Sequence, residues 1–213
     1  LRAPIAAVEQ QLTVILSRMA GDVSEKQEKL LARAKERTRG LLNLIKDLLD
    51  LSKIEAGRMV QYKEPVTLQE IIQRVVDLMR VEAENKKIDL QFPAPSQNPL
   101  IHADRTSMEG VFTNLISNAI KYTPEGGKVW VTLSEEGGFA KASVSDTGIG
   151  IKKEDLSRIF DKFYRVRTTE TRQIVGTGLG LSIVKSIVDA HLGSISVESE
   201  EGGGTTFNVL FPK

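Results

Sequence analysis

Apolar residues along the first twenty positions recur at alternating spacings of three and four. They are Ile5, Val8, Leu12, Ile15 and Met19. Because an α-helix turns once in about 3.6 residues, these side chains share one face, and the pattern predicts an amphipathic helix. Gly21 and Asp22 interrupt the pattern, so we expect the helix to end there.

A second helix is predicted to begin after Ser24, because Ser24 and Gln27 have the spacing of a capping box. Its apolar positions follow a heptad register, with Arg37 as a polar exception, until Gly57 supplies a helix stop. The register positions are Leu30, Ala34, Leu41, Leu44, Leu48 and Leu51, and a second apolar flank consists of Leu31, Leu42, Ile45 and Leu49. One helical hairpin over residues 1–57 cannot bury both sets, so we predict a homodimer in which two hairpins form a four-helix bundle.

From Pro65 onward helical and strand patterns alternate, which predicts an α/β domain over residues 66–213 after a linker at 58–65. Helices are expected at 67–84, from the N-cap Asp104 to Ala119, and at 180–191. Strands are expected at 88–92 and 100–102 around a Pro-rich loop, in a hairpin at 129–144, and in a closing hairpin at 195–212.

Composition excludes several classes of protein. The 29 basic and 28 acidic residues leave a net charge of +1, so no overall attraction to nucleic acid or to anionic membranes is expected. Cysteine is absent, which removes thiolate chemistry and is compatible with the cytoplasm. No apolar run approaches the ~20 residues of a membrane span. Because the chain begins at Leu1 without methionine, we expect a soluble fragment without membrane contact of its own, and a membrane anchor in the longer protein is compatible with it.

Four motifs rich in glycine or asparagine follow one another in the second domain. They are Asn114-Leu-Ile-Ser-Asn118-Ala-Ile-Lys121-Tyr122, Asp146-Thr-Gly148-Ile-Gly150, Gly176-Thr-Gly178-Leu-Gly180 and Gly202-Gly203-Gly204-Thr205. Each is weak evidence alone, because a glycine pair after a strand is usually a turn. The segment from Ile159 to Val166 lies between the second and the third. This ordered set resembles the N, G1, F, G2 and G3 boxes of the catalytic domain of sensor histidine kinases, and Leu1 to Ile5 resembles the end of their phosphoacceptor box.

The resemblance implies a fold and a set of ligands. The fold is a helical hairpin, a four-helix bundle in the dimer, followed by an α/β two-layer sandwich of the histidine kinase/gyrase ATPase (Bergerat) type. The ligands are ATP and Mg²⁺, with Asn118 on the metal. The implied nucleotide-binding residues are Asn114, Asn118, Lys121, Tyr122, Asp146, Gly148, Gly150, Arg165, Gly176, Thr177, Gly178, Leu179, Gly180 and Thr205.

The chemistry of the first two boxes agrees with these roles. Asn114, Asn118 and Lys121 are spaced to share one helix face, although an ordinary exposed polar face has the same pattern. An amide oxygen suits Mg²⁺ that triphosphate already neutralises, and Lys121 suits phosphate. By resemblance Asp146 accepts from the adenine amino group, which favours ATP over GTP. An Asx-turn at Asp146 is compatible with that role, and Tyr122 either covers the base or closes the core.

The third box directly precedes a helix, so its free amide groups and the helix dipole can hold phosphate. The stretch from Arg165 to Gln173 is expected to be a mobile lid over the nucleotide. Arg165 is expected to contact phosphate by resemblance, whereas Arg167 and Arg172 are interpreted as solvated loop residues. The sequence lacks the P-loop and the Ser/Thr/Tyr kinase motifs, and the glycine spacing does not fit a dinucleotide site.

The phosphoacceptor histidine of the family is expected two residues before Leu1. His102 and His191 fall in the nucleotide domain, where surface or packing roles are expected for both. We therefore expect that this fragment lacks its own acceptor. Asn114 stands where related ATPases have a glutamate base, which predicts slow attack by water, and Ala3 at the family's phosphatase position predicts weak dephosphorylation of the partner.

The predicted function is that of a histidine kinase that passes the γ-phosphoryl group from ATP to a bundle histidine and then to an aspartate of a response-regulator receiver domain. Two alternatives remain open from the sequence. One is a pseudokinase scaffold that binds nucleotide without transfer. The other is a serine kinase or ATPase of the same superfamily, which the long heptad hairpin disfavours. We also predict a hinge between Gly57 and Pro65.

Overall fold

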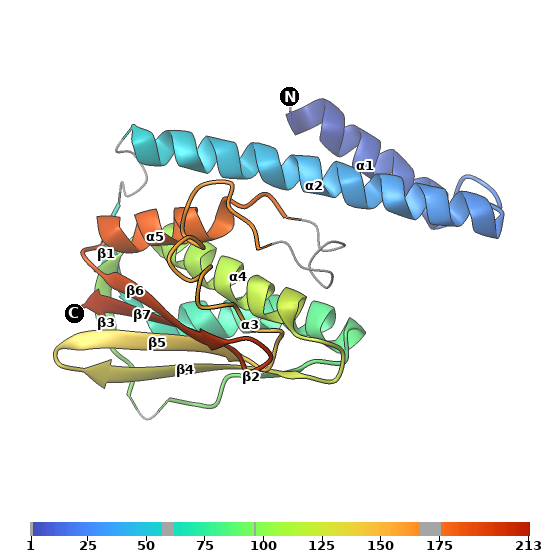
Figure 1. Cartoon of the computed structure of the whole chain (residues 1–213). Coiled ribbons are helices and arrows are strands. Elements are labelled where there is room, and N and C mark those ends of the chain that lie inside the picture. Colours follow the sequence, from blue (N-terminus) through green and yellow to red (C-terminus); the bar gives the residue numbers. More distant parts are fainter. Residues whose placement is uncertain (1, 57–61, 96, 167–175) are drawn as a thin grey trace. The chain divides into compact units, whose positions relative to one another are not determined.

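The computed structural model describes residues 2–56, 62–95, 97–166 and 176–213. The described residues fall into two compact units, and each is described by itself (Figure 1). The first contains the chain up to Ser52 together with Gly176 and Thr177, and the second contains the rest from Lys53 onward. Among the described residues, no helix is both long and apolar enough to cross a lipid bilayer.

The first unit is a pair of helices, α1 (Arg2–Leu16) and α2 (Glu25–Glu55). The predicted capping box is confirmed, since the Ser24 N–H donates to Gln27 Oε1 at 2.8 Å and the Gln27 N–H donates to Ser24 Oγ at 3.4 Å. The expectation that Met19 lies on α1 is wrong. The helix ends at Leu16, because Arg18 adopts a left-handed φ of 61° and its carbonyl accepts from Gly21 N–H.

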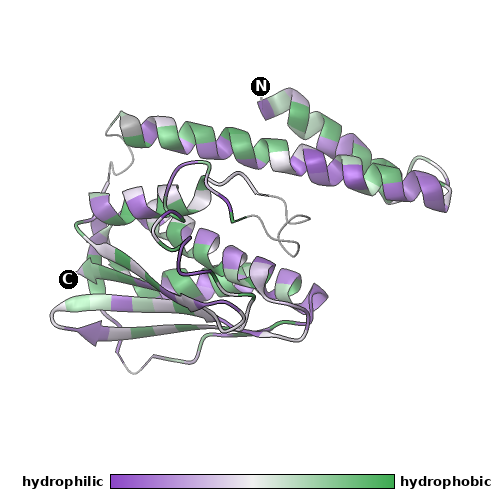
Figure 2. Ribbon diagram, in the orientation of Figure 1, coloured by the Kyte–Doolittle hydropathy of each residue, from purple (hydrophilic) through white to green (hydrophobic). Residues whose placement is uncertain are grey.

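Apolar residues recur along both helices of this pair (Figure 2). Within one chain, large apolar side chains of the pair are exposed, among them Val8, Leu30, Leu41 and Leu48. The helices are joined by an ion pair in which Arg39 Nε lies 3.1 Å from Glu9 Oε1.

The second unit contains a five-stranded sheet with strand order β2-β4-β5-β7-β6. The strands are β2 (Asp89–Gln91), β4 (Lys128–Glu136), β5 (Phe139–Asp146), β6 (Ser194–Glu200) and β7 (Gly204–Pro212). In this sheet β2 and β4 pair parallel, whereas β4–β5, β5–β7 and β7–β6 pair antiparallel. Buried and exposed residues alternate along β4, so one face of the sheet supplies the core.

Three helices cover that face of the sheet (Figure 1). They are α3 (Leu68–Asn85), α4 (Arg105–Tyr122) and α5 (Gly180–Ala190). Fully buried side chains from both layers, including Ile71, Phe112, Ile187 and Phe211, fill the space between them. The predicted two-layer α/β sandwich is confirmed.

A small second sheet was not predicted. It consists of β1 (Glu64–Thr67) and β3 (Leu100–Ala103), which pair antiparallel with Val66 opposite Ile101. Strand β1 contains Pro65 and has one buried residue, so neither composition nor alternation marks it. Strand β2 is shorter than expected because the Ile88 N–H bonds to the Ala83 carbonyl at 2.8 Å and belongs to the end of α3.

Candidate nucleotide-binding site

The site is described from helix α4, whose start agrees with the prediction. Asp104 is the N-cap, and its carboxylate accepts from the Ser107 N–H at 2.7 Å. Asn114, Asn118 and Lys121 follow on one helix face, and all three side chains are half-buried. The carboxyl-terminal half of α4 therefore presents two amides and one amine on a single face, where they can contact a common ligand.

Asp146 is the last residue of β5 and is buried. Its Oδ1 accepts from the Gly148 N–H at 2.7 Å, which forms an Asx-turn. As expected from the sequence, such a turn is compatible with a role in ligand binding. Burial raises its pKa from the ordinary 3.8 to about 6, and backbone hydrogen bonds from Gly148 and Thr205 act against that rise. Burial therefore disfavours the ionised form of this carboxyl, so the charged side chain lowers the stability of the fold.

The glycines of the G1 box are required by close packing. A Cβ on Gly148 would lie 2.7 Å from the Tyr122 carbonyl oxygen, and one on Gly150 would lie 1.9 Å from the Glu200 carbonyl oxygen. Gly150 also has a φ of 67°. The turn after Asp146 is therefore lined by backbone, as binding of a flat base requires.

The G1 and G3 boxes are neighbours across the sheet. Asp146 is paired in register with Thr205, although they are far apart in the chain. Ser199 joins the two turns, because its hydroxyl accepts from the Ile151 N–H at 2.9 Å and lies 2.9 Å from Thr205 Oγ1. Sequence reasoning missed Ser199, since a serine in a Ser/Glu-rich strand has no recognisable signal.

The end of α4 meets the G1 turn directly. The Ile149 N–H donates to the Tyr122 carbonyl at 3.2 Å. Burial, followed by the nearby charge of Arg165, lowers the pKa of Lys121 below its ordinary value. Lys121 Nζ also lies 5.6 Å from the centre of the Tyr122 ring. The charges of Lys121 and Arg165 thus interact near the end of α4, and two neighbouring cations suit a phosphate anion.

The G2 box enters helix α5. Gly178 has a φ of 75°, and a Cβ there would lie 2.8 Å from the Phe163 backbone carbon of the F box. A Cβ on Gly180 would lie 2.7 Å from Asn114 Oδ1 of the N box. The Leu179 side chain is fully buried, so only its backbone can face a ligand. The amino end of α5 therefore lies against both the F box and the N box.

Comparisons with known proteins agree with this arrangement. Residues 103–213 match the family described as "Histidine kinase-, DNA gyrase B-, and HSP90-like ATPase". Residues 1–57 match the family described as "His Kinase A (phospho-acceptor) domain". The chain belongs to the sensor histidine kinases. Its second domain is accordingly an ATP-binding domain of that family.

Individual histidine kinases are similar over the whole chain. "Histidine protein kinase DivJ" of Caulobacter vibrioides is 36% identical over 100% of this chain and 35% of its own length. "Sensor histidine kinase WalK" of Bacillus subtilis is 34% identical over 100% of this chain and 35% of its own length. The chain thus spans roughly a quarter to a third of the curated relatives that it matches.

Solved histidine kinases have the same fold. ShkA in complex with AMPPNP has a TM-score of 0.72 at 28% identity, over 99% of this chain and 43% of that chain. ThkA in complex with the response regulator protein TrrA has a TM-score of 0.73 at 28% identity, over 99% of this chain and 60% of that chain.

Several histidine kinase features stay predictions. Gly176 and Thr177 precede Gly178 in the chain, and their roles are untested. Gly57 and positions 167–173 of the stretch expected to form a lid, with Arg167 and Arg172 among them, lie outside the described residues.

The two histidines occupy the places expected of them. His102 is exposed on β3, and His191 is buried at the end of α5. Residues 1–57 match the phosphoacceptor family, so the expectation that this fragment lacks its own acceptor histidine is not supported.

Proposed function

We propose that the protein binds ATP with Mg²⁺, transfers the γ-phosphoryl group to a histidine of its phosphoacceptor helix, and passes it on to an aspartate of a response-regulator receiver domain. The observation that supports this most is Asp146, a buried carboxylate with a raised pKa in a backbone-lined turn. Its family supports the same reaction.

The pocket is proposed to read the nucleotide from two ends. At one end Asp146 accepts a hydrogen bond from the adenine amino group, while Gly148 and Gly150 admit the base. A guanine presents a carbonyl in that position, so it would be rejected. Thr205 pairs with Asp146 and so belongs to this first end. At the other end Lys121, Arg165 and the backbone from Gly176 to Gly180 hold the phosphates.

We assign the metal to Asn118. No group of three His, Cys, Asp or Glu side chains in the described ranges could hold a metal ion. In this proposal the phosphate oxygens of ATP supply most of the ligands of Mg²⁺. One half-buried amide oxygen fits that requirement, because Mg²⁺ commonly takes few protein ligands beside phosphate and water. When bound, the ion neutralises charge on the transferred phosphoryl group.

In the transfer step an imidazole nitrogen attacks the γ-phosphorus, the bond to the bridging oxygen breaks, and ADP leaves. The chain's own residues position the substrate rather than accept its protons. Asn114 carries an amide, which does not accept a proton at neutral pH and so cannot serve as a base for water. Its Nδ2 donates to the Gly110 carbonyl at 3.0 Å. Hydrolysis should therefore be slow compared with transfer.

The acceptor and the partner are proposed from the family. The acceptor histidine is expected before Leu1 in the longer protein, within a phosphoacceptor domain that includes residues 1–57. ThkA was solved in complex with a response regulator, and we propose the same class of partner here. We further propose that the hairpin forms a homodimer, and that residues 1–57, 58–65 and 66–213 are hairpin, linker and catalytic domain.

Calorimetry on the 213-residue chain with ADP, AMPPNP and GDP in the presence of Mg²⁺ tests the pocket. We expect both adenine nucleotides to bind, GDP not to bind, and Asp146→Asn to weaken ADP binding by about tenfold or more. Asp89→Asn, at an exposed carboxylate on β2, is the matched control and should bind ADP like the wild type.

Incubating the full-length protein with γ-labelled ATP tests the transfer. An acid-labile, base-stable phosphoramidate is expected. Nucleotide binding without label would indicate a pseudokinase, acid-stable label would indicate a serine kinase, and absence of any nucleotide binding by the wild type would refute the proposal altogether.

A further inference from the structure

Helix α3 ends in a closed backbone motif at Lys86. The Ile88 N–H donates to the Ala83 carbonyl at 2.8 Å, and the Lys87 N–H donates to the Glu84 carbonyl at 2.9 Å. Lys87 has the left-handed φ of 55° that this motif requires. Because the backbone of Lys87 and Ile88 already satisfies the end of α3, the Lys86 side chain is available to another element.

That element is α4. Lys86 Nζ donates to the Ile120 carbonyl at 2.8 Å and to the Lys121 carbonyl at 2.7 Å. Lys86 is half-buried, so solvent competes only in part for these bonds. A cation at this end also suits the negative end of the helix dipole.

Each carbonyl of the last turn of α4 thereby has a donor. The Ala119 carbonyl accepts from the Thr123 hydroxyl at 2.7 Å, and the Tyr122 carbonyl accepts from the Ile149 N–H at 3.2 Å. Lys86 Nζ donates to the two carbonyls between these, those of Ile120 and Lys121. The last turn of α4 is therefore held from three directions: by its own cap, by the G1 turn and by α3.

We infer that Lys86 is a positioning residue for Lys121 in nucleotide binding. This rests on the proposed function, because Lys121 is the residue assigned to phosphate. The Lys86 amine is bonded to the backbone of Lys121 itself, so it sets where the Lys121 side chain begins. Lys86 touches no substrate in this proposal.

The expected effect follows from the geometry. Without the Lys86 amine, two carbonyls at the end of α4 must find water instead, and the last turn is free to fray. Lys121 would then be less well placed beside Arg165 and Tyr122. Nucleotide affinity should fall even though no ligand contact has been removed.

The test measures ADP binding with Mg²⁺ by calorimetry for Lys86→Met, Lys86→Arg and the control Lys87→Met in the 213-residue chain. Lys87 is the adjacent lysine, and its Nζ pairs with the exposed Glu125. We expect Lys86→Met to weaken ADP binding about fivefold or more, Lys86→Arg to recover most of that loss, and Lys87→Met to stay within about twofold of the wild type.

A double-mutant cycle separates positioning from a general effect on the fold. In a Lys121→Met background, Lys86→Met should weaken ADP binding far less than it does in the wild type. If Lys86→Met does not fold, Lys86→Gln replaces it under the same criteria.

The inference is overturned if Lys86→Met binds like the wild type, if Lys87→Met loses as much, or if the two losses in the cycle simply add. Failure of the wild type to bind ADP would instead refute the proposed function.

Discussion

Asp146 shows at the residue scale what a binding site costs the fold. Its carboxyl is buried, and burial raises its pKa to about 6, so at neutral pH the chain holds a charge that it would be more stable without. The Gly148 N–H offsets part of this cost. Because an ionised carboxyl in this place does not stabilise the fold, we expect it to be kept for the nucleotide-binding role proposed above.

The sign of the resulting pH dependence can be stated. The folded-state pKa lies above the unfolded value of 3.8, so the stability associated with protonated Asp146 is complete below that value and is lost as the pH rises through about 6. Asp146→Asn removes this loss. We expect the variant's gain in the free energy of unfolding to be about 1 to 1.5 kcal/mol larger at pH 8 than at pH 5.

Urea denaturation of the ligand-free chain at both pH values provides the measurement. Asp89→Asn, at the exposed carboxylate of β2, is the control and should change stability equally at pH 5 and pH 8. An Asp146→Asn gain in stability that is equal at both pH values would mean that burial does not raise the pKa of this carboxyl.

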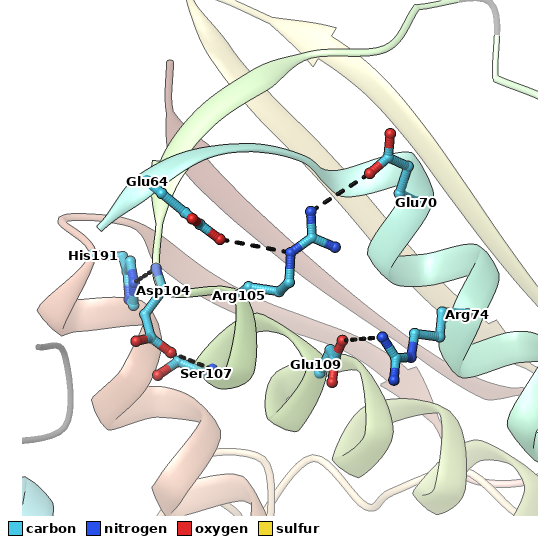
Figure 3. A network of polar contacts seen from close by, with 8 residues as sticks. All are labelled: Glu64, Glu70, Arg74, Asp104, Arg105, Ser107, Glu109 and His191. Atoms are coloured by element: carbon cyan, nitrogen blue, oxygen red, sulfur yellow. Dashed lines mark hydrogen bonds and ion pairs between the residues drawn. The ribbon is translucent and has the colours of Figure 1, made fainter. Parts of the chain in front are cut away.

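At the scale of elements, the polar contacts that join α4 to its neighbours differ in how much they stabilise the fold. Arg105 lies between Glu64 of β1 and Glu70 of α3, and Arg74 pairs with Glu109 (Figure 3). These ion pairs are largely solvent-exposed, so each contributes about 1 kcal/mol or less.

The buried contact in the same view is more consequential. The His191 Nε2 accepts from the Asp104 N–H at 3.1 Å (Figure 3). Its Nδ1 lies 2.8 Å from the Ile187 carbonyl. The imidazole thereby joins the end of α5 to the start of α4, the two helices that present the G2 and N boxes. Both bonds require the neutral ring with its proton on Nδ1.

His191 therefore predicts a second pH dependence, of opposite sign to that of Asp146. Burial lowers its pKa below the ordinary 6.5, partly opposed by the Ile187 carbonyl and Asp104, while Lys63 adds to the lowering. The contribution of the neutral ring is complete above pH 6.5 and declines as the pH falls below it. We expect the stability lost on His191→Phe to be smaller at pH 5 than at pH 7.5.

Only variant-minus-wild-type differences isolate this effect, because Asp146 contributes the opposite trend in the wild type. Thermal or urea denaturation at pH 5 and 7.5 measures them. His102→Gln, at the exposed histidine of β3, serves as the control. Equal losses for His191→Phe at both pH values would contradict the neutral bridging role.

At the scale of the whole molecule, the hairpin is incomplete within one chain. Leu30, Leu41 and Leu48 of the heptad register are 58%, 51% and 44% exposed. Such a row of leucines on an amphipathic helix is stable in water when a second apolar surface covers it. A second copy of the hairpin is the partner that the register favours.

We therefore expect the chain to sediment as a dimer and Leu41→Lys to raise the dissociation constant about a hundredfold or more, since each dimer would bury two charges. Analytical ultracentrifugation measures this. Leu78→Lys is the matched control, because Leu78 is a leucine of α3 that is 69% exposed outside the hairpin. A dimer that persists in Leu41→Lys but dissociates in Leu78→Lys would place the interface elsewhere.

Much of this organisation could be predicted because it depends on local spacing. The Ser24–Gln27 capping box, the Asp104 N-cap and the alternation along β4 each depend on residues within a few positions of one another. Strand β1 and the early end of α1 could not be predicted. The first needs a partner strand, and the second depends on the left-handed backbone of Arg18.

The sequence by itself determined the order of the glycine and asparagine boxes and the faces on which their side chains lie, because helix and strand periods are local properties of the chain. Tertiary structure decided which boxes meet. The pairing of Asp146 with Thr205, the approach of Gly180 to Asn114 and the reach of Lys86 to α4 join residues 34 or more positions apart. Such contacts leave no periodic signal, because they depend on how whole elements pack against one another.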